Sequence, residues 1–577
     1  MQTSGTSGDS ASVTRLAQWF ARRPYLSLTL LVLLALGPFL AKPLNVDDPL
    51  FVWAAKRITM HPADPYGFNV NWYGTSMPMW ATTKNPPLAC YYLALAGTGL
   101  GWSEVALHAA MLLPAIAAVL GTYRLARHFC DHPGLAAVVT LLSPVFLISS
   151  STLMCDTMML AFWIWATVWW VEGLKKNDVL RLVGSGVLIA LAALTKYYGI
   201  CLVPLLLVHA LWDRRKMGAW LWCLAIPVAA MVAFELASWA RYGTGLFLEA
   251  GYFTQSSRNA GQSRWADAVF GLAFVGGCLA ATTFLTPMLW KARTQLVLIS
   301  MAALMVISLF ASGTMTRLYS EPSGSRLLWA GLQMIIWATG GLGIIWLTVV
   351  ELRRRFDPET WLLCGWALGT IVFTTFCNWT INGRSILPAT PAVAILLTRH
   401  WNRLAGSKDW RRVVAMGGLA LSALLAVLCT WADFRLATAV RQTAQQAAAH
   451  RGDQKSELWL DAHWGMQYYL EALGGRSIDW RQSACKENDL VVIALNNPTF
   501  VKNPTTLEQD FKNIHLETVL TSRGSSFLTT VQTCLGASYY SSHFGPLPFA
   551  FGRVPPEAVY VYRVGSAREQ SAETSPP

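Results

Sequence analysis

Long apolar stretches recur along most of the chain, separated by short polar connections. A helix that crosses a bilayer needs about 20 mostly apolar residues, and about thirteen segments approach that length. They lie near residues 25–42, 104–126, 134–151, 157–173, 181–195, 198–212, 218–240, 265–289, 294–312, 326–350, 359–377, 385–399 and 413–432. We therefore predict an all-α polytopic membrane protein with about thirteen transmembrane helices.

Three stretches do not fit the pattern of spans. Residues 43–103 form a long outer loop, in which the sequence predicts short helices near 49–60 and 87–96. A second outer loop is expected over 241–264. After the last span the sequence becomes mixed and polar, with strand-like and helix-like runs that predict a small soluble α/β domain. The strand-like runs are 458–461 and 489–495, and the helix-like run is 462–473.

The expected organisation has four parts. The N-terminal part is rich in Ser, Thr and Gly and is expected to be partly disordered, and the last residues are polar. The parts are a cytoplasmic N-terminus (1–24), a transmembrane domain (25–432), a soluble α/β domain (433–566) and a disordered tail (567–577).

The composition agrees with a membrane protein. Of the 577 residues, 54% are hydrophobic and only 13% are charged, which is too apolar for a soluble protein of this size. The formal net charge is +13. The basic residues occur in twos and threes between apolar segments, so they form no continuous footprint of the kind that nucleic acid requires.

The basic residues also predict the orientation. They cluster in alternate connections: Arg22-Arg23, Arg124/Arg127, Lys175-Lys176/Arg181, Arg214-Arg215-Lys216, Lys291/Arg293, Arg353-Arg354-Arg355 and Arg399/Arg403/Lys408/Arg411-Arg412. By the positive-inside rule these connections face the cytoplasm. The N-terminus is then cytoplasmic, and an odd number of spans places the C-terminal domain outside. The short loops and compact soluble domain suggest a bacterial inner membrane with a periplasmic C-terminal domain.

Two of the eleven cysteines lie in the polar C-terminal part, and the other nine are embedded separately in apolar sequence. Cys485 and Cys534 are therefore candidates for a disulfide if this part faces an oxidising compartment. No pair of cysteines has metal-ligand spacing. The sequence predicts no bound metal and no other cofactor.

Seven ionisable residues lie at the outer ends of the predicted spans or in the outer loops. Ionisable groups near membrane depth are costly and are therefore functional candidates. Their predicted convergence on one side is the strongest physical indication of a site. They are Asp47, Asp48, Lys84, Asp156, Lys196, Arg258 and Arg384.

Each acidic candidate also has a structural interpretation. Asp48 precedes Pro49 and suits the N-terminus of a helix. One carboxylate is enough for that purpose, which leaves Asp47 free to act as a base or to orient a hydroxyl. Asp156 can likewise cap the fourth span.

The basic candidates have ordinary interpretations as well. Lys84 can extend along the membrane surface with its charge in water, or hold a lipid phosphate there. Lys196 ends the fifth span, where a cation is favourable, and Arg384 can anchor the twelfth span at the interface. Arg258 competes with two neighbouring arginines. His463 is interpreted as a domain histidine.

Several enzyme classes are disfavoured because their motifs are absent from the sequence. There is no H-E-x-x-H, Walker loop, G-x-S-x-G or dinucleotide-binding G-x-G-x-x-G. These absences argue against zinc proteases, ATP-driven pumps, α/β-hydrolases and dinucleotide enzymes. A transporter or lipid flippase remains the main alternative, although such proteins often contain internal repeats and no convincing repeat is visible.

A spaced set of motifs resembles the GT-C membrane glycosyltransferases, specifically the dolichyl-phosphate-mannose protein mannosyltransferase and aminoarabinose (lipid A) transferase group. The motifs are the acidic pair Asp47-Asp48, K-x-P-P-L at Lys84, G-x-S-E-x-A at Gly101, Asp156, A-x-L-T-K-x-x-G at Ala192, R-x-x-L-P-A-x-P at Arg384 and W-x-x-x-Y-Y-L at Trp464. Two departures are that the first pair is commonly Asp-Glu and that Asn85 precedes the prolines.

The resemblance implies a polyprenyl-phosphate sugar donor and a catalytic carboxylate in the first outer loop. We expect an inverting single displacement in which Asp47 or Asp48, with Asp156, acts on the acceptor hydroxyl. Lys84 and Arg384 would stabilise the departing phosphate, aided by Arg258 and Lys196. Undecaprenyl phosphate is the expected carrier, and the acceptor is a protein, glycan or lipid. The motifs do not identify the sugar, hexose or pentose.

Overall fold

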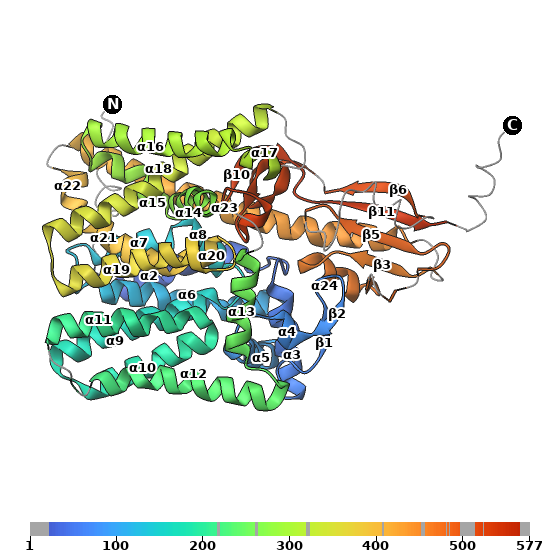
Figure 1. Ribbon diagram of the computed structural model, residues 1–577, viewed down its shortest axis with the longest axis horizontal. Helices are drawn as coiled ribbons and strands as arrows, with labels where there is room; N and C mark the ends of the chain where they lie inside the picture. Colours follow the sequence, from blue (N-terminus) through green and yellow to red (C-terminus); the bar gives the residue numbers. More distant parts are fainter. Residues whose placement is uncertain are drawn as a thin grey trace, which may run out of the picture.

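The protein consists of a helical bundle and a smaller α/β lobe at one end of it (Figure 1). The computed structural model describes residues 22–215, 218, 220–259, 263–318, 324–406, 409–451, 456–479, 482–483, 485–496, 514–522 and 524–565. Short helices and two short strands lie between the bundle and the lobe. This arrangement confirms the predicted fold class, a helical membrane protein with a small C-terminal α/β part.

All thirteen apolar segments are helical for most of their length. Proline stands in the first turn of several of these helices, where its missing N–H costs nothing. The bundle contains α2 (Pro24–Leu36), α6 (Glu104–Ala126), α7 (Pro133–Leu141), α8 (Pro144–Ser150), α9 (Asp156–Lys176), α10 (Val179–Thr195), α11 (Leu202–Arg214), α12 (Trp220–Tyr242), α14 (Arg264–Cys278), α15 (Ala280–Leu285), α16 (Ala292–Ala311), α17 (Thr314–Leu318), α18 (Gly324–Arg354), α19 (Pro358–Val372), α20 (Gly383–Ile386), α21 (Thr390–Thr398), α22 (Trp401–Ala405) and α23 (Asp409–Ala449).

The number of spans depends on how bent and short helices are counted. Within the described ranges, seven helices are long and apolar enough to cross a membrane. The count rises to nine if each of two sharply bent helix pairs forms one span. Four shorter apolar helices lie beside them: Pro24–Phe39, Leu88–Leu100, Val179–Thr195 and Gly383–Thr398. The predicted total of thirteen therefore stays a prediction.

The two segments that the sequence predicts as outer loops, called the first and second outer segments below, are more ordered than expected. The first contains the two predicted helices, here α3 (Asp48–Met60) and α5 (Leu88–Leu100), together with α4 (Met79–Thr82) and the strand pair β1 (Asn69–Asn71) and β2 (Ser76–Pro78). The second, expected to be a loop, forms α13 (Leu246–Asn259). The Glu235 carboxylate accepts the backbone N–H of Phe247 at 2.8 Å and that of Leu248 at 3.2 Å. Because this N-terminal support comes from α12, the local sequence did not reveal it.

The lobe contains a five-stranded mixed sheet of order β4-β3-β5-β11-β6. Strand β3 runs parallel to β4 and β5, whereas β11 is antiparallel to β5 and β6. The two predicted strands and the predicted helix are confirmed as β3 (Leu458–Asp461), β5 (Leu490–Ala494) and α24 (Trp464–Ala472). The remaining strands are β4 (Arg476–Ser477), β6 (Ile514–Thr521), β7 (Ser526–Thr529), β8 (Val531–Gln532), β9 (Ala537–Ser538), β10 (Ala550–Val554) and β11 (Ala558–Val564).

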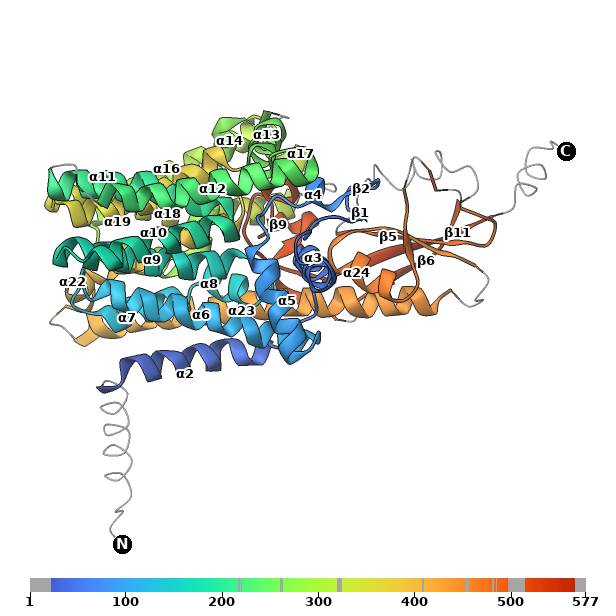
Figure 2. The ribbon, with the colours of Figure 1, turned by 90° about the horizontal axis from the view of Figure 1, so that it is seen from below.

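Helix α23 joins the two parts without a break. It runs along the bundle and continues beneath the strands of the lobe (Figure 2). The boundary that the sequence placed between residues 432 and 433 therefore falls inside a helix, and the first strand of the lobe begins at Leu458.

The two cysteines of the lobe lie in different apolar environments. Among the described residues, Cys485 is a free thiol packed against the small cluster that contains Trp459 and Val491. Cys534 instead packs against the main core. The structure therefore does not contain the disulfide that the sequence suggested, because each sulfur fills a separate apolar region.

A fully buried ion pair ties the first span to α23 and the lobe. The Lys42 Nζ atom lies 2.5 Å from a carboxylate oxygen of Asp433, and both side chains are 0% exposed. The hydroxyls of Thr530 and Tyr540, both in the lobe, donate to the same carboxylate at 2.8 Å. Because a buried charge is tolerated only when paired and hydrogen-bonded, this cluster fixes three distant parts of the chain to one another.

We expect either Lys42→Met or Asp433→Asn alone to destabilise the protein by about 3–5 kcal/mol, because each leaves one buried charge unpaired. The double variant should regain most of that loss. The unfolding midpoint in detergent, followed by loss of monodisperse protein, measures the change. Arg476→Gln, which removes an exposed ion pair with Glu457, is the control and should change little. Equal loss in the single and double variants would contradict the pairing.

Candidate functional site

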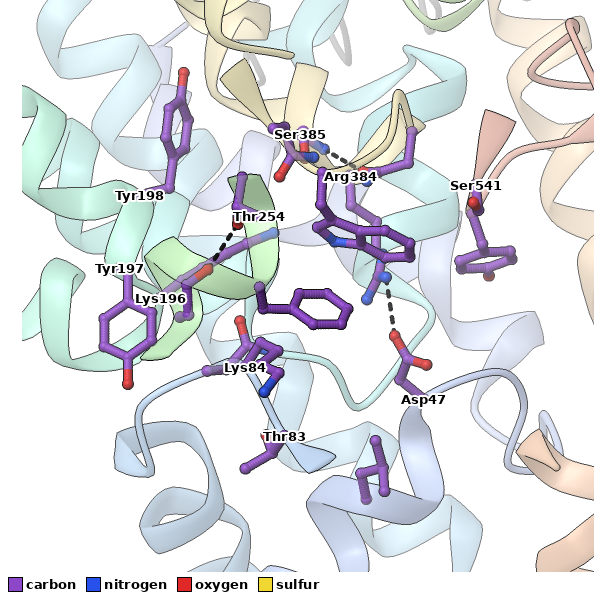
Figure 3. A pocket seen from close by; sticks show the side chains of 18 of the residues that line it. Asp47, Thr83, Lys84, Lys196, Tyr197, Tyr198, Thr254, Arg384, Ser385 and Ser541 are labelled. Atoms are coloured by element: carbon purple, nitrogen blue, oxygen red, sulfur yellow. Dashed lines mark hydrogen bonds and ion pairs between the residues drawn. The ribbon is translucent and has the colours of Figure 1, made fainter. Parts of the chain in front are cut away.

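A cavity of about 710 Å³ lies where the bundle, the outer helices and the lobe meet. Its walls come from the first outer segment, the turn after α10, α13, the segment around α20, and two segments of the lobe. Four charged residues line it: Asp47, Lys84, Lys196 and Arg384. Figure 3 shows these four side chains around one space. The predicted convergence of charges is therefore present for four of the seven candidates.

Asp47 and Arg384 are in direct contact. A guanidinium nitrogen of Arg384 lies 2.9 Å from a carboxylate oxygen of Asp47 (Figure 3). Arg384 sits in the first turn of α20, whose start is capped by the Asn382 side chain accepting the Ser385 N–H at 2.8 Å. A side-chain carbon at Gly383 would lie 2.2 Å from the ring of a lobe tyrosine. The absence of a side chain at this glycine thus allows the lobe to pack beside Arg384.

The structure separates the roles of the two neighbouring aspartates. Asp48 is 0% exposed and does not line the cavity. Its two carboxylate oxygens accept the backbone N–H groups of Asn45 at 3.0 Å and Leu153 at 2.8 Å. Asp47 keeps 27% of its side chain exposed. Of the pair, Asp47 is therefore the carboxylate that a substrate can reach.

Asp156 lies behind the cavity wall. Its side chain is 1% exposed, with one oxygen 2.5 Å from Lys196 Nζ and the other 3.9 Å from a guanidinium nitrogen of Arg384. A carboxylate held between two cations and shielded from the cavity suits the positioning of those cations. The placement gives it no access to an acceptor.

Lys84 reaches the cavity from the outer loop. Its ammonium donates to the Ala81 carbonyl at 2.8 Å, lies 3.6 Å from Glu249 on α13 and is 4.8 Å from the ring centre of Phe253. Burial lowers the pKa of Lys84, and the Glu249 carboxylate opposes that shift. Lys84 thus connects the two outer segments and presents a cation to the cavity.

Arg258 does not join the other cations. It is on α13, but its guanidinium pairs with Asp267 of α14 at 3.0 Å and also donates to the Thr375 carbonyl. It is not among the residues that line the cavity. The predicted phosphate-binding role is therefore not supported by its position, because both ends of its guanidinium are directed at the bundle.

Aromatic residues make up much of the remaining lining, and sequence reasoning did not select them. The ring of Tyr540 lies under Arg384, with 5.7 Å between the guanidinium carbon and the ring centre. The other lining rings from the lobe and from the segment after α19 are His463, Trp464, His543, Phe544, Phe373 and Trp379. His463 was noted only as a domain histidine. The others carry no local signal, because single aromatic residues are also common in ordinary cores.

No group of three or more His, Cys, Asp or Glu side chains within the described ranges is arranged to hold a metal ion. Metal independence remains a prediction that only an activity measurement tests.

Part of the chain matches a known family. Residues 84–239 match the sequence profile described as dolichyl-phosphate-mannose-protein mannosyltransferase. This match confirms the predicted GT-C resemblance. The matched region contains Lys84, Asp156 and Lys196, and it covers helices α5 to α12. No curated protein sequence matches the chain.

Solved structures of GT-C enzymes resemble most of the chain weakly. ArnT from Cupriavidus metallidurans in the apo state is 14% identical with a TM-score of 0.46, over 87% of this chain and 96% of ArnT. The archaeal oligosaccharyltransferase AglB from Archaeoglobus fulgidus, in complex with an inhibitory peptide and a dolichol-phosphate, is 16% identical with a TM-score of 0.44, over 80% of this chain and 65% of AglB. Because these TM-scores are below 0.5, the function has to be argued from the site.

The different burial of Asp47 and Asp156 predicts losses of stability of different size. Asp156→Asn removes the buried partner of Lys196 and Arg384 and should destabilise the helical bundle by about 3–5 kcal/mol. Asp47→Asn removes a partly exposed charge and should cost less than about 1 kcal/mol. Thermal unfolding of the detergent-purified variants measures both. A loss as large for Asp47→Asn as for Asp156→Asn would make Asp47 a structural residue.

Proposed function

We propose that this protein transfers a sugar from a polyprenyl phosphate to an acceptor hydroxyl on the outer face of the membrane. In a bacterial inner membrane the carrier would be undecaprenyl phosphate and the outer face would be periplasmic. The observation that supports this proposal is the cavity in which one reachable carboxylate, Asp47, faces three cations, Lys84, Lys196 and Arg384.

The cations suit the phosphate of the donor. A sugar attached to a lipid monophosphate leaves as a phosphate that gains negative charge while the glycosidic bond breaks. Preorganised cations in a site of low dielectric stabilise such developing charge more strongly than water does. Lys84, Lys196 and Arg384 come from three distant segments, and each is partly withdrawn from solvent, with 11–19% of its side chain exposed.

One wall of the cavity suits a lipid chain. The residues contributed by α13 and by the turn after α10 are largely apolar: Phe247, Leu248, Phe253, Tyr197, Ile200 and Cys201. Lys196 starts this turn, and Lys84 lies against Phe253. A ligand with a phosphate next to an isoprenoid chain would match a wall in which cations border apolar side chains.

The placement of Asp47 opposite the cations supports a single displacement. The acceptor oxygen attacks the anomeric carbon and forms the new C–O bond, while the bond between that carbon and the phosphate oxygen breaks and its electron pair leaves with the lipid phosphate. Asp47 takes the proton of the acceptor hydroxyl as general base. A single displacement of this kind inverts the anomeric centre.

Arg384 connects the two halves of the reaction. It contacts Asp47 directly and is held from behind by Asp156. A donor phosphate in the cavity would share its guanidinium with Asp47, so phosphate binding and orientation of the base are coupled through one side chain. Asp156 acts through Lys196 and Arg384 and is a positioning residue in this mechanism.

Sugar release from a panel of radiolabelled polyprenyl-phosphate sugars, hexoses and pentoses, tests the proposal on purified protein in nanodiscs with candidate acceptors. We expect one donor to be turned over, Asp47→Asn to lower kcat by at least about 100-fold because the general base is lost, and Lys84→Ala to lower kcat/KM. Asp131→Asn and Lys56→Ala alter exposed residues outside the cavity and should retain activity.

The same experiment can rule out the proposed transferase activity. If no donor is turned over by folded protein but labelled polyprenyl phosphate moves across the bilayer of proteoliposomes, the protein is a lipid transporter. Full activity in Asp47→Asn would remove the proposed base even if a donor were turned over.

The three cations also make a divalent ion unnecessary for neutralising a monophosphate. We expect turnover by the purified enzyme to persist in excess EDTA and to be unchanged when Mg²⁺ or Mn²⁺ is added back. Loss of turnover in EDTA with recovery on adding either ion would show that the protein uses a metal.

A further inference from the structure

The cavity has a second wall, to which the proposed sugar transfer assigns no role so far. Its core is a row of four rings, Trp72, His463, Trp464 and Phe544, all of which line the cavity. Successive ring centres lie 5.4 Å, 5.6 Å and 5.7 Å apart. Three of these residues come from the lobe and one from the first outer segment, so the row spans the junction between them.

This aromatic row carries no formal charge. Burial lowers the pKa of His463 to about 3, so its imidazole is neutral at physiological pH. None of the described lobe residues that line the cavity is a Lys, Arg, Asp or Glu. The charged lining residues all come from segments that precede the lobe in the chain. In Figure 3, Lys196 and Lys84 lie on one side of the cavity and the lobe residue Ser541 lies on the other.

The backbone holds the row in a fixed position next to Asp47. Trp464 has φ of 63° and Val46 has φ of 50°, and this left-handed region is unfavourable for bulky and β-branched residues. Such backbone conformations persist only where the surroundings enforce them, often at functional sites. Here one strained residue presents its indole to the cavity and the other immediately precedes the reachable carboxylate.

Direct packing links the two segments that carry these strained residues. A side-chain carbon at Gly465 would lie 2.3 Å from the Leu44 carbonyl oxygen, so α24 rests against the segment that leads to Asp47. The Leu44 N–H donates to the Tyr469 hydroxyl of the same helix at 2.7 Å. The start of α24, which carries Trp464, is therefore packed against the segment that carries Asp47.

We propose that the aromatic row is the acceptor subsite and that the acceptor is an uncharged sugar ring, which stacks on Trp464 and offers a hydroxyl to Asp47. This inference rests on the proposed function. Flat ring faces bind the apolar face of a sugar through burial and dispersion. A phosphorylated acceptor would instead bring an anion along a wall whose own residues supply no cation. The nearest cation, Arg384, is already paired with Asp47 and, in the proposed reaction, binds the donor phosphate.

The test measures binding without requiring turnover. Matched neutral and phosphorylated oligosaccharides are titrated into full-length protein in nanodiscs, and saturation-transfer difference NMR reports the bound sugar. We expect the neutral sugars to bind and Trp464→Ala to weaken that binding about tenfold, because the stacking face is lost. Trp464→Phe keeps a ring and should restore most of it. Trp222→Ala, which removes a tryptophan that is 77% exposed on α12, should bind as the unaltered protein does.

Three outcomes would overturn the inference. In the first, neutral sugars bind equally well to the unaltered protein and to Trp464→Ala. In the second, the unaltered protein prefers the phosphorylated sugars. In the third, Trp464→Ala keeps its saccharide binding but has a higher KM for the donor, which would assign the aromatic row to the donor's own sugar. Failure of the proposed function would look different: neutral sugars would bind at Trp464, but no donor would be turned over. Phe544→Leu provides a second variant should Trp464→Ala not fold.

Discussion

The buried contact between Lys42 and Asp433 is the constraint on which the arrangement of the site depends. A lysine and a carboxylate without solvent access are stable only in each other's presence, so the chain after the first span, helix α23 and the lobe must meet at one point. Tyr540 takes part in this cluster through its hydroxyl and faces Arg384 with its ring. A single side chain, Tyr540, thus separates the buried ion pair from Arg384 in the cavity.

The acidic residues of the site differ in how far a ligand can reach them. Asp48 and Asp156 are buried and bind groups of the protein itself, whereas Asp47 can reach a ligand. Burial strengthens electrostatic interactions and makes an unpaired charge costly, so the buried acids hold their partners in fixed positions. In the proposed reaction, cations held in this way would act on the donor phosphate without reorganising.

The sequence predicted the helical bundle, the strands β3 and β5 and helix α24, because these follow from local hydrophobic patterns. It also located four charged cavity residues, since ionisable groups at the ends of apolar segments are rare. It did not reveal the partnership of Lys42 and Asp433, which are 391 positions apart, or the withdrawal of Arg258 to Asp267. Helix α13 was missed because its first N–H groups are satisfied by Glu235 on another helix. Such facts depend on tertiary contacts that no local pattern encodes.

The origin of the cavity walls in the chain has a consequence for biosynthesis. The first wall is made by residues 46–51, and the last pieces, residues 540–544, follow almost five hundred residues later. A ribosome that inserts the helices in order makes Asp47 and the three cations before it makes the lobe. The cavity is therefore enclosed only after the last part of the chain has folded against the bundle.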